Sequence, residues 1–370
     1  MKVLHVAESI RGGCGTYLNE LLPGLIAESG SDDVCVLAPD RHLSQLPDVA
    51  PRAIRSFRRP ARAIGLLFLT VRLIATIREF RPDVIHAHST FAGAIARVLA
   101  IFLPRVPPIV YCPHGWVFDT ARSSAMRRRT EAVERFLARW CVAIVAISNA
   151  EKRAGEAAGI SSGRIVVIHN GIRPSLPIRT VAVWTDTRLR ALFVGRLDRQ
   201  KGLDVLLEAV RPLEKAVAVR VVGAAVVSRG RNPGDCANVE YLGWLCGTQV
   251  AAQIEACDVV VMPSRWEGFG LVALEAMRSA KPVIASRVGG LAEIVVDGVT
   301  GRLVRAGDPG AVRAALLADS AQERARMGSA GLERFQALYS IDRTRTQLDS
   351  LYRAVVNGSA QGALDWLPRQ

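Results

Sequence analysis

Several features that would assign the protein quickly are missing from its 370 residues. The seven cysteines are widely separated, form no C-x-x-C pair and show no His–Cys metal spacing. An odd number of scattered cysteines indicates the reduced, mostly buried thiols of a cytoplasmic protein, not a disulfide framework. Solenoid repeats, collagen-like periods and low-complexity stretches are also absent. Fibrous, repeat and disulfide-rich secreted proteins are therefore excluded.

Long apolar runs are missing as well. Residues 63–77 (AIGLLFLTVRLIATI) have helical spacing, but Arg72 interrupts them, and they are shorter than the about 20 residues that cross a bilayer. Residues 1–10 resemble a signal peptide only as far as Glu8, so we expect a first buried strand there instead.

Composition and charge give two further constraints. Half of the residues are apolar and 31 are glycines, as in globular proteins, and the length favours two domains. The formal net charge is +14, and basic residues gather in residues 50–82 and 122–130. Beside the apolar residues 63–77, the first cluster predicts either a surface that rests on anionic lipid or a core helix with a solvated basic flank. Nucleic-acid binding is disfavoured, because aromatic side chains do not alternate with the basic ones.

Short β-branched runs alternate with helical patterns along the whole chain, which predicts parallel sheets covered by crossover helices. The expected strands of the first half are residues 2–7, 33–39, 83–89, 108–115, 141–148 and 164–172. Those of the second half are residues 190–197, 218–224, 238–244, 258–264, 282–290 and 301–307. We therefore expect an α/β protein with two doubly wound, Rossmann-like domains.

The break between the domains is expected in residues 173–187, which hold two prolines and little periodicity. The predicted organisation is an N-terminal domain over 1–175, a linker over 176–187, a C-terminal domain over 188–345, and a helix or tail over 346–370 that crosses back to the first domain. Ligands of such sheets bind beyond the carboxyl ends of the strands, so two facing sheets predict one interdomain cleft.

A glycine-bearing turn with Gly12, Gly13 and Gly15 follows the first predicted strand and precedes a helix. Backbone N–H groups at such a turn, with the helix dipole behind them, can bind phosphate. The strict G-x-G-x-x-G dinucleotide pattern is absent, so a plain tight turn is the alternative.

Two cations, Arg196 and Lys201, follow the first strand of the second half and precede a predicted helix over residues 202–210. An arginine fork and a lysine point charge suit a diphosphate, which gains negative charge as a leaving group. Solvated loop charges are the alternative explanation.

The stretch RWEGFGLVALEAM, residues 265–277, places Glu267 in a loop after a strand and Glu275 in a helix. A carboxylate among apolar side chains needs a partner, and the two hydroxyls of a ribose match its two oxygens. Glu267 can accept hydrogen bonds from further hydroxyls. The backbone N–H groups expected to face the same place are those of Phe269, Gly270 and Leu271.

The histidines of the first half follow or occupy predicted strands. His114 stands in PHG at a strand end, where we expect a functional role. His86 and His88 alternate on a buried strand and are expected to be structural, with His88 nearer the cleft. Ser148 and Asn149 either cap the next helix, which we favour, or touch an acceptor.

Together and in this order, the motifs resemble those of the family-4 glycosyltransferases of GT-B fold. The resemblance rests on Glu267 and Glu275 in EGFGLVALEAM, on KPVIAS and GRLDRQKG, and on HNGI, the HG of residues 114–115 and the N-terminal GG. It covers nearly the whole chain, from the first strand to about Tyr352.

The resemblance implies a retaining enzyme that moves a hexosyl group from a nucleotide-sugar, with UDP or GDP as carrier, to a hydroxyl of a saccharide acceptor. No metal and no other cofactor is expected, because two cations and a helix N-terminus can stabilise the leaving diphosphate. No Asp-x-Asp metal pair follows a predicted strand. A phosphate oxygen can take the acceptor's proton on the face that the diphosphate leaves, which gives retention.

By the same resemblance, Arg196 and Lys201 hold the diphosphate and Glu275 holds the ribose. The donor sugar and its phosphates are held by Glu267 with the backbone of Gly268, Phe269, Gly270 and Leu271.

From the first domain, the resemblance implies that Gly13 and Gly15 approach the diphosphate and that His114 lies beside the transferred sugar. The expected catalytic residues are His114, Glu267, Arg196 and Lys201.

A sugar-nucleotide epimerase of the same architecture is the alternative, and it would release free nucleotide without an acceptor. Because residues 50–82 are arginine-rich and apolar, we expect a cytoplasmic protein bound peripherally at the inner face of the cell membrane. Its acceptor would be a saccharide, expected to be lipid-linked, in the synthesis of a bacterial-type exopolysaccharide, lipopolysaccharide or other cell-surface glycan.

Overall fold

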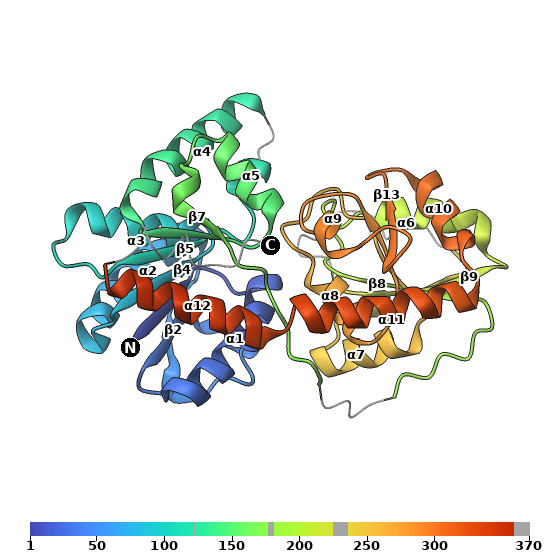
Figure 1. Ribbon diagram of the computed structural model, residues 1–370, viewed down its shortest axis with the longest axis horizontal. Coiled ribbons are helices and arrows are strands. Elements are labelled where there is room, and N and C mark those ends of the chain that lie inside the picture. The colour runs from blue at the N-terminus through green and yellow to red at the C-terminus, as the bar shows by residue number, and fades with distance from the viewer. Residues whose placement is uncertain (121–122, 177–180, 225–235, 359–370) are drawn as a thin grey trace. The chain divides into compact units, whose positions relative to one another are not determined.

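The computed structural model describes residues 1–120, 123–176, 181–224 and 236–358 (Figure 1). The chain forms two compact units, one of Met1–Gly171 with Ile341–Gln370 and the other of Ile172–Ser340. Part of the predicted linker and the end of the predicted tail therefore lie outside the described residues. The seven cysteines all lie within them and are unpaired, as expected, and Cys246 is exposed.

Seven parallel strands build the sheet of the first unit, in the order β3-β2-β1-β4-β5-β6-β7. Their bounds are β1 Val3–Ala7, β2 Val34–Pro39, β3 Ile54–Phe57, β4 Val84–His88, β5 Ile109–Cys112, β6 Ala143–Ala146 and β7 Ile165–Val167. The sequence predicted all of them except β3. This edge strand exposes Arg55 and Ser56, so it lacks the two apolar faces by which the others were found.

Helices cover both faces of this sheet: α1 Gly13–Ser29, α2 Arg62–Phe80, α3 Thr90–Phe102, α4 Ser124–Leu137, α5 Asn149–Ala157 and α12 Ile341–Val356. Side chains of a strand alternate between the faces. Leu4 and Ile85 belong to the core cluster that includes residues of α2 and α3. His5 and His88 point to the other face, where Tyr17 of α1 and Tyr352 of α12 contact their rings.

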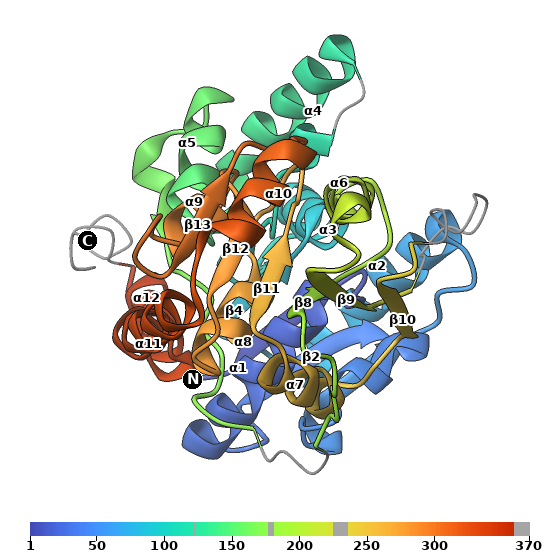
Figure 2. The same cartoon turned by 90° about the vertical axis from the view of Figure 1, so that its right-hand side faces the viewer.

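Six parallel strands build the sheet of the second unit, in the order β10-β9-β8-β11-β12-β13 (Figure 2). Their bounds are β8 Leu189–Val194, β9 Val217–Val222, β10 Val239–Gly243, β11 Val259–Met262, β12 Val283–Ser286 and β13 Gly301–Val304. The helices are α6 Leu203–Val210, α7 Gly247–Ala256, α8 Leu271–Arg278, α9 Leu291–Ile294, α10 Pro309–Ala318 and α11 Ala321–Leu338. Each strand matches a predicted one, which confirms two doubly wound α/β domains.

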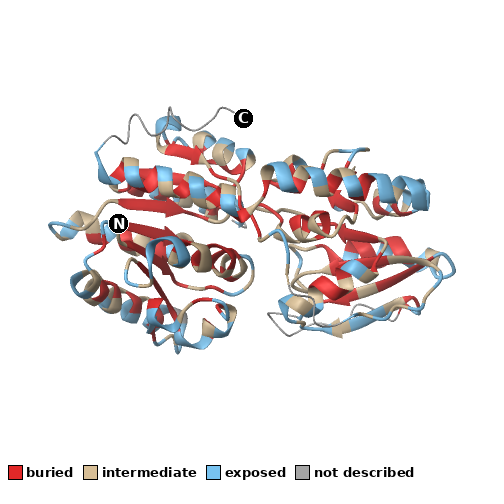
Figure 3. Ribbon diagram, turned by 60° about the horizontal axis from the view of Figure 1, so that its bottom comes forward, coloured by how far each residue is buried: buried red, intermediate tan, exposed pale blue. Residues whose placement is uncertain are grey.

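Each sheet has one point where the strand order reverses, between β1 and β4 in the first unit and between β8 and β11 in the second. The central strands are buried and the helices expose their outer faces (Figure 3), whereas the edge strands β3 and β10 are partly exposed. Loops that leave the two central strands turn to opposite faces at this point, which opens a crevice for ligands. The predicted site residues follow β1 and β5 in one unit and β8 and β11 in the other.

A buried ion pair crosses the helical layer of the first unit. Arg97 of α3 is fully buried, Glu134 of α4 is 2% exposed, and Nη2 lies 2.9 Å from Oε2. The Arg97 Nε donates to the carbonyl oxygen of Gly93 at 2.9 Å, and the guanidinium carbon lies 3.9 Å from the ring centroid of Tyr111. The arginine is thus partnered on three sides.

Replacing Arg97 by alanine is expected to lower the free energy of unfolding by about 3–5 kcal/mol, because Glu134 is left as a buried, uncompensated charge. Urea unfolding of the variant measures this. The double variant Arg97→Met, Glu134→Leu removes both charges and should lose less than Arg97→Ala alone. A loss below about 1 kcal/mol in Arg97→Ala would contradict the assignment of this pair.

Candidate functional site

Arg196 and Lys201 lie in the loop between β8 and α6, and both are held by neighbours in that loop or the next. The Arg196 Nε is 3.0 Å from Asp198 Oδ2, and its Nη2 donates to Gln200 Oε1 at 2.6 Å. Gln200 in turn donates through Nε2 to the carbonyl oxygen of Trp266 at 3.2 Å. The β8 and β11 loops are therefore tied together at the switch point of the sheet.

The strongest link between these loops is an ion pair. The Nζ of Lys201 lies 2.5 Å from Oε2 of Glu267, and the side chains are only 18% and 11% exposed. The hydroxyl of Ser264 donates to the same carboxylate oxygen at 3.4 Å. Charge-assisted bonds of this kind are short and strong when water is largely excluded. The structure thus brings together a predicted cation and a predicted carboxylate that are 66 residues apart.

The loop after Glu267 leads directly into α8, with Gly270 as its N-cap and Leu271 as its first residue. Phe269 is buried. Gly289, which follows β12, has a positive φ of 48°, and a Cβ there would collide with the carbonyl oxygen of Glu267. Only glycine lets the two loops approach this closely. The sequence does not predict this contact.

Glu275 lies in the second turn of α8, on the same short helix whose N-terminus the loop presents. It is partly exposed, whereas Leu274 and Ala276 on either side are buried. The carboxylate therefore lies at the edge of the core and remains partly accessible to solvent. Helix N-termini favour negatively charged ligands, so α8 contributes to the potential of this region.

The glycine turn of the first unit lies between β1 and α1. Gly13 is the first residue of α1 and is exposed, and nothing lies within 4 Å of a Cβ built on it. Gly15 is buried, and a Cβ there would collide with the carbonyl oxygen of Ile10. Gly13 is thus open to a ligand, while the small size of Gly15 serves the packing of the turn.

His114 lies just after β5 in a left-handed backbone conformation, with φ of 53°. The next residue is anchored by Glu151 of α5, whose Oε1 accepts from the Gly115 N–H at 2.5 Å and whose Oε2 accepts from the Ile147 N–H at 2.6 Å. Burial raises the pKa of Glu151 to about 7, against the effect of these two bonds. Ser148 caps α5, as predicted. Glu151 was missed in the sequence because only its distant partners reveal its role.

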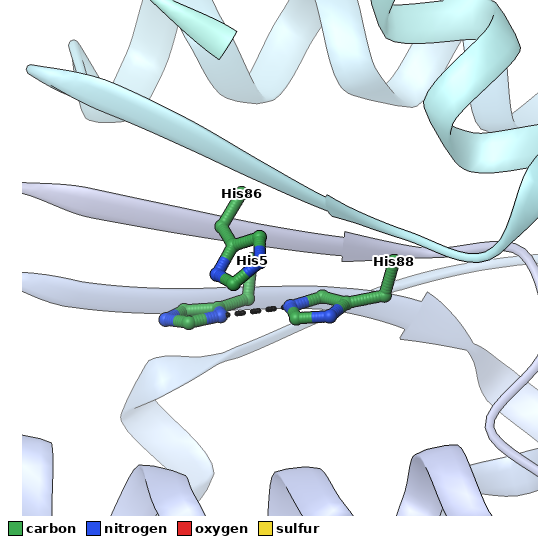
Figure 4. A group of neighbouring side chains, drawn as sticks. All are labelled: His5, His86 and His88. Atoms are coloured by element: carbon green, nitrogen blue, oxygen red, sulfur yellow. Dashed lines mark hydrogen bonds between the residues drawn. The ribbon is translucent and has the colours of Figure 1, made fainter. Parts of the chain in front are cut away.

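A chain of histidines continues from His114 into the unit, and Figure 4 shows its inner part, His5 and His88, with His86 beside them. His114 Nε2 lies 2.9 Å from Nδ1 of His88, and His88 Nε2 lies 3.0 Å from Nδ1 of His5. His86 pairs separately, with its Nδ1 2.6 Å from the hydroxyl of Tyr352. Burial lowers the pKa of His5 to about 3 and that of His114 to about 4, so these rings are neutral near pH 7.

Two trios in this cluster have potential metal-ligand atoms within 4.8 Å of one another, namely His5, His86 and His88, and His88, Cys112 and His114. In each trio, two of the imidazole nitrogens already face each other in a hydrogen bond. The His86 ring lies against that of His88, with centroids 4.1 Å apart and an interplanar angle of 36°. Metal ligands must instead point at one common position. We therefore interpret the cluster as a hydrogen-bonded chain.

Comparison with known proteins agrees with this fold. The family model described as Glycosyltransferase Family 4 matches residues 11–176, and the model described as Glycosyl transferases group 1 matches residues 188–318. An uncharacterized 41.2 kDa protein in the cps region of Klebsiella pneumoniae is 32% identical over 315 residues, covering 82% of this chain and 86% of that protein. Glycogen synthase of Mycobacterium tuberculosis is 30% identical over 322 residues, covering 79% and 74%.

Among solved structures, HepE of Anabaena in complex with UDP-glucose has a TM-score of 0.77 and 22% identity, covering 96% of this chain and 100% of that one. Two doubly wound, Rossmann-like units are the architecture of the GT-B fold. The chain belongs to the family-4 glycosyltransferases. This confirms the family and the fold expected from the motifs.

The buried histidines predict that the protein loses stability as the pH falls. Between about pH 6.5 and pH 3, His5 is protonated in the unfolded chain but neutral in the folded protein. As the pH falls through this range, His5 alone therefore lowers the free energy of unfolding by about 1.4 kcal/mol per pH unit. His114 acts in the same direction down to about pH 4. Glu151 has a raised folded pKa of about 7 and an ordinary value of 4.5. Between these values it acts in the opposite direction and offsets one histidine.

Urea unfolding at a series of pH values between about 7 and 5 measures this dependence. The variant His5→Asn removes one of the histidines and should show a shallower fall with decreasing pH. A free energy of unfolding that stays constant in this range would contradict neutral, buried histidines.

Proposed function

We propose that the protein is a retaining glycosyltransferase that needs no metal or other cofactor. It moves a hexosyl group from a UDP- or GDP-sugar to a hydroxyl of a saccharide acceptor. The observation that carries the proposal is the pairing of Lys201 with Glu267 beside the N-terminus of α8, at the switch point of the second sheet. HepE, which shares the fold, was solved with UDP-glucose, and this supports a nucleotide-sugar as donor.

The diphosphate is assigned to Arg196, Lys201 and the start of α8. Negative charge grows on the diphosphate as the sugar leaves, so fixed cations and N–H groups stabilise the transition state more than the ground state. The Nζ of Lys201 lies 2.5 Å from Oε2 of Glu267. The carboxylate thus fixes the position of the ammonium group that we assign to the diphosphate.

The two glutamates are assigned to hydroxyl groups. Glu275 accepts from the ribose hydroxyls, and Glu267 accepts from hydroxyls of the transferred sugar. Both come from one loop and the helix that follows it, and Glu267 already faces a lysine. An acid and base pair of a glycosidase would instead flank the scissile bond from two sides. The proton of the acceptor hydroxyl goes to a phosphate oxygen on the same face, which gives retention.

Of the first unit, we assign Gly13 to the diphosphate and His114 to a hydrogen bond with the transferred sugar. The Nε2 of His114 faces His88. The other ring nitrogen, Nδ1, is the one that we assign to the sugar. The strained backbone at this residue is the kind of outlier that collects at functional sites. Gly15 supports the turn from inside.

Lys201→Ala should lower kcat/KM by roughly a hundredfold or more, because a cation facing the leaving group is lost. Glu275→Gln should weaken donor binding, because its carboxylate no longer accepts from both ribose hydroxyls. Calorimetry with UDP- and GDP-sugars and nucleotide release with a saccharide acceptor measure the two effects. The matched controls are Lys215→Ala and Glu255→Gln, which change exposed residues of the same unit.

Near-normal turnover of Lys201→Ala would contradict the assigned diphosphate site. Nucleotide release that needs no added acceptor, together with a modified free sugar, would support an epimerase in place of a transferase.

We further propose that the first unit docks on the inner face of the cell membrane, where a lipid-linked saccharide of a cell-surface glycan is the acceptor. One face of α2, here called the α2 surface, consists of Ile64, Leu67, Phe68 and Val71, which are 51%, 65%, 41% and 60% exposed. The opposite face, with Leu69 and Leu73, packs in the core. Among the described residues, no helix is both long and apolar enough to span a bilayer.

The charge next to the α2 surface favours anionic lipid as its occupant. Arg52, Arg55 and Arg58, which precede α2, are exposed. Apolar side chains that enter the headgroup region and nearby arginines that attract anionic lipid act together in peripheral binding.

Sedimentation with vesicles that contain phosphatidylglycerol tests this docking. Binding is expected at low salt and should weaken as salt is raised. The variant Leu67→Asp, Val71→Asp should bind at least about tenfold more weakly, because two apolar side chains no longer enter the bilayer. The control Leu317→Asp changes an equally exposed leucine of α10 and should bind normally. No binding of the unmodified protein at low salt would contradict the proposal.

A further inference from the structure

We propose that His88 and His5 are positioning residues, which fix the proton of His114 on Nδ1 through a buried imidazole chain. The inference deepens the proposed function, because it rests on the role of His114 beside the transferred sugar. It concerns residues that the sequence presents only as part of a buried strand.

The register of the sheet builds the chain. β1 and β4 are parallel neighbours, and His5 of β1 stands opposite His86 of β4. His88 follows two residues later and therefore points to the same face. The His88 ring is hydrogen-bonded to His5 on one side and to His114 on the other. The rings of His5 and His88 are nearly parallel, with an interplanar angle of 8° (Figure 4). His114 continues the line from the end of β5.

A neutral imidazole has one N–H donor and one bare nitrogen that accepts. His88 uses both nitrogens within the chain, so it donates to one neighbour and accepts from the other. If it donates to Nε2 of His114, the proton of His114 must be on Nδ1. If it donates to His5, His114 must donate through Nε2, and its Nδ1 is bare. The tautomers of the three rings are therefore set together.

The inner end of the chain decides between these two patterns. Nε2 of His5 is buried and has no hydrogen-bond partner. When His88 donates to His5, this nitrogen carries a buried N–H without an acceptor, and such groups are rare in folded proteins. When His5 donates to His88, the same nitrogen is bare. The pattern in which His5 donates to His88, and His88 donates to His114, is therefore favoured, and it leaves His114 with an Nδ1–H at the site.

An Nδ1–H on His114 suits the proposed role. A sugar hydroxyl oxygen accepts from it, and the bond needs no reorganisation of the ring during the reaction. Glu151 fixes the backbone of the same loop through the Gly115 N–H. His114 is thus held at its ring by His88 and at its backbone by Glu151.

The test is the tautomer of His114, read from the ¹⁵N shifts and long-range ¹⁵N–¹H couplings of its ring in the free protein at neutral pH. The signal is assigned by its loss in His114→Asn. We expect Nδ1 to be protonated and Nε2 to be bare. In His88→Leu the fixed tautomer should be lost, whereas His88→Asn keeps a donor near the position of Nδ1 and should restore it.

Activity of the same variants provides the second measurement. His88→Leu should lower kcat by about ten- to a hundredfold with little change in KM for the donor, because His114 is present but misdirected. His88→Asn should recover most of this loss. The matched control is His86→Leu, a buried histidine of the same strand outside the chain. It should lower the melting temperature but leave the tautomer of His114 and the kcat unchanged.

An Nε2–H tautomer of His114, or an equal mixture of the two, would overturn the proposal. So would a folded His88→Leu variant with unchanged kcat. Because the tautomer is read without donor or acceptor, it is decided independently of the proposed reaction. Absence of sugar transfer by the unmodified protein would contradict the proposed function instead.

Discussion

Both units depend on one constraint: parallel strands end together at the same edge of a sheet. Loops that leave neighbouring strands must meet there, whatever their distance in the sequence. The reversal of strand order at β1 and β4, and at β8 and β11, then separates the flanking loops and leaves room for a ligand. Lys201 and Glu267 become partners because β8 and β11 are adjacent, and His5 joins His88 because β1 and β4 are. The site residues of each unit follow from its topology.

The cations of the second unit are paired within the chain. Lys201 faces Glu267, and Arg196 contacts Asp198 and Gln200. An isolated charge would be costly in a partly buried loop, and these partners remove that cost. The histidines of the first unit differ from these ion pairs. They are buried in neutral form and hydrogen-bonded to one another, which fixes direction without adding charge.

Much of the fold could be predicted from the sequence because buried parallel strands are apolar on both faces. β3 was not predicted, because this edge strand exposes Arg55 and therefore does not have two apolar faces. The motif residues around Glu267 were recognised from their spacing and resemblance. The ion pair with Lys201, the role of Glu151 and the contact of Gly289 required the three-dimensional structure, because each joins segments far apart in the chain. His88 was expected to be structural, and only its hydrogen bonds in the folded structure show that it links His5 and His114.

The central claim is that the loops after β8 and β11, with the N-terminus of α8, bind a nucleoside diphosphate without a metal. The most direct measurement is thermal stabilisation of the protein by UDP, GDP, ADP and their common sugars, first with a chelator and then with magnesium. We predict that one nucleotide raises the melting temperature in the chelator and that magnesium adds little. Stabilisation only with magnesium, or by none of these ligands, would contradict the claim.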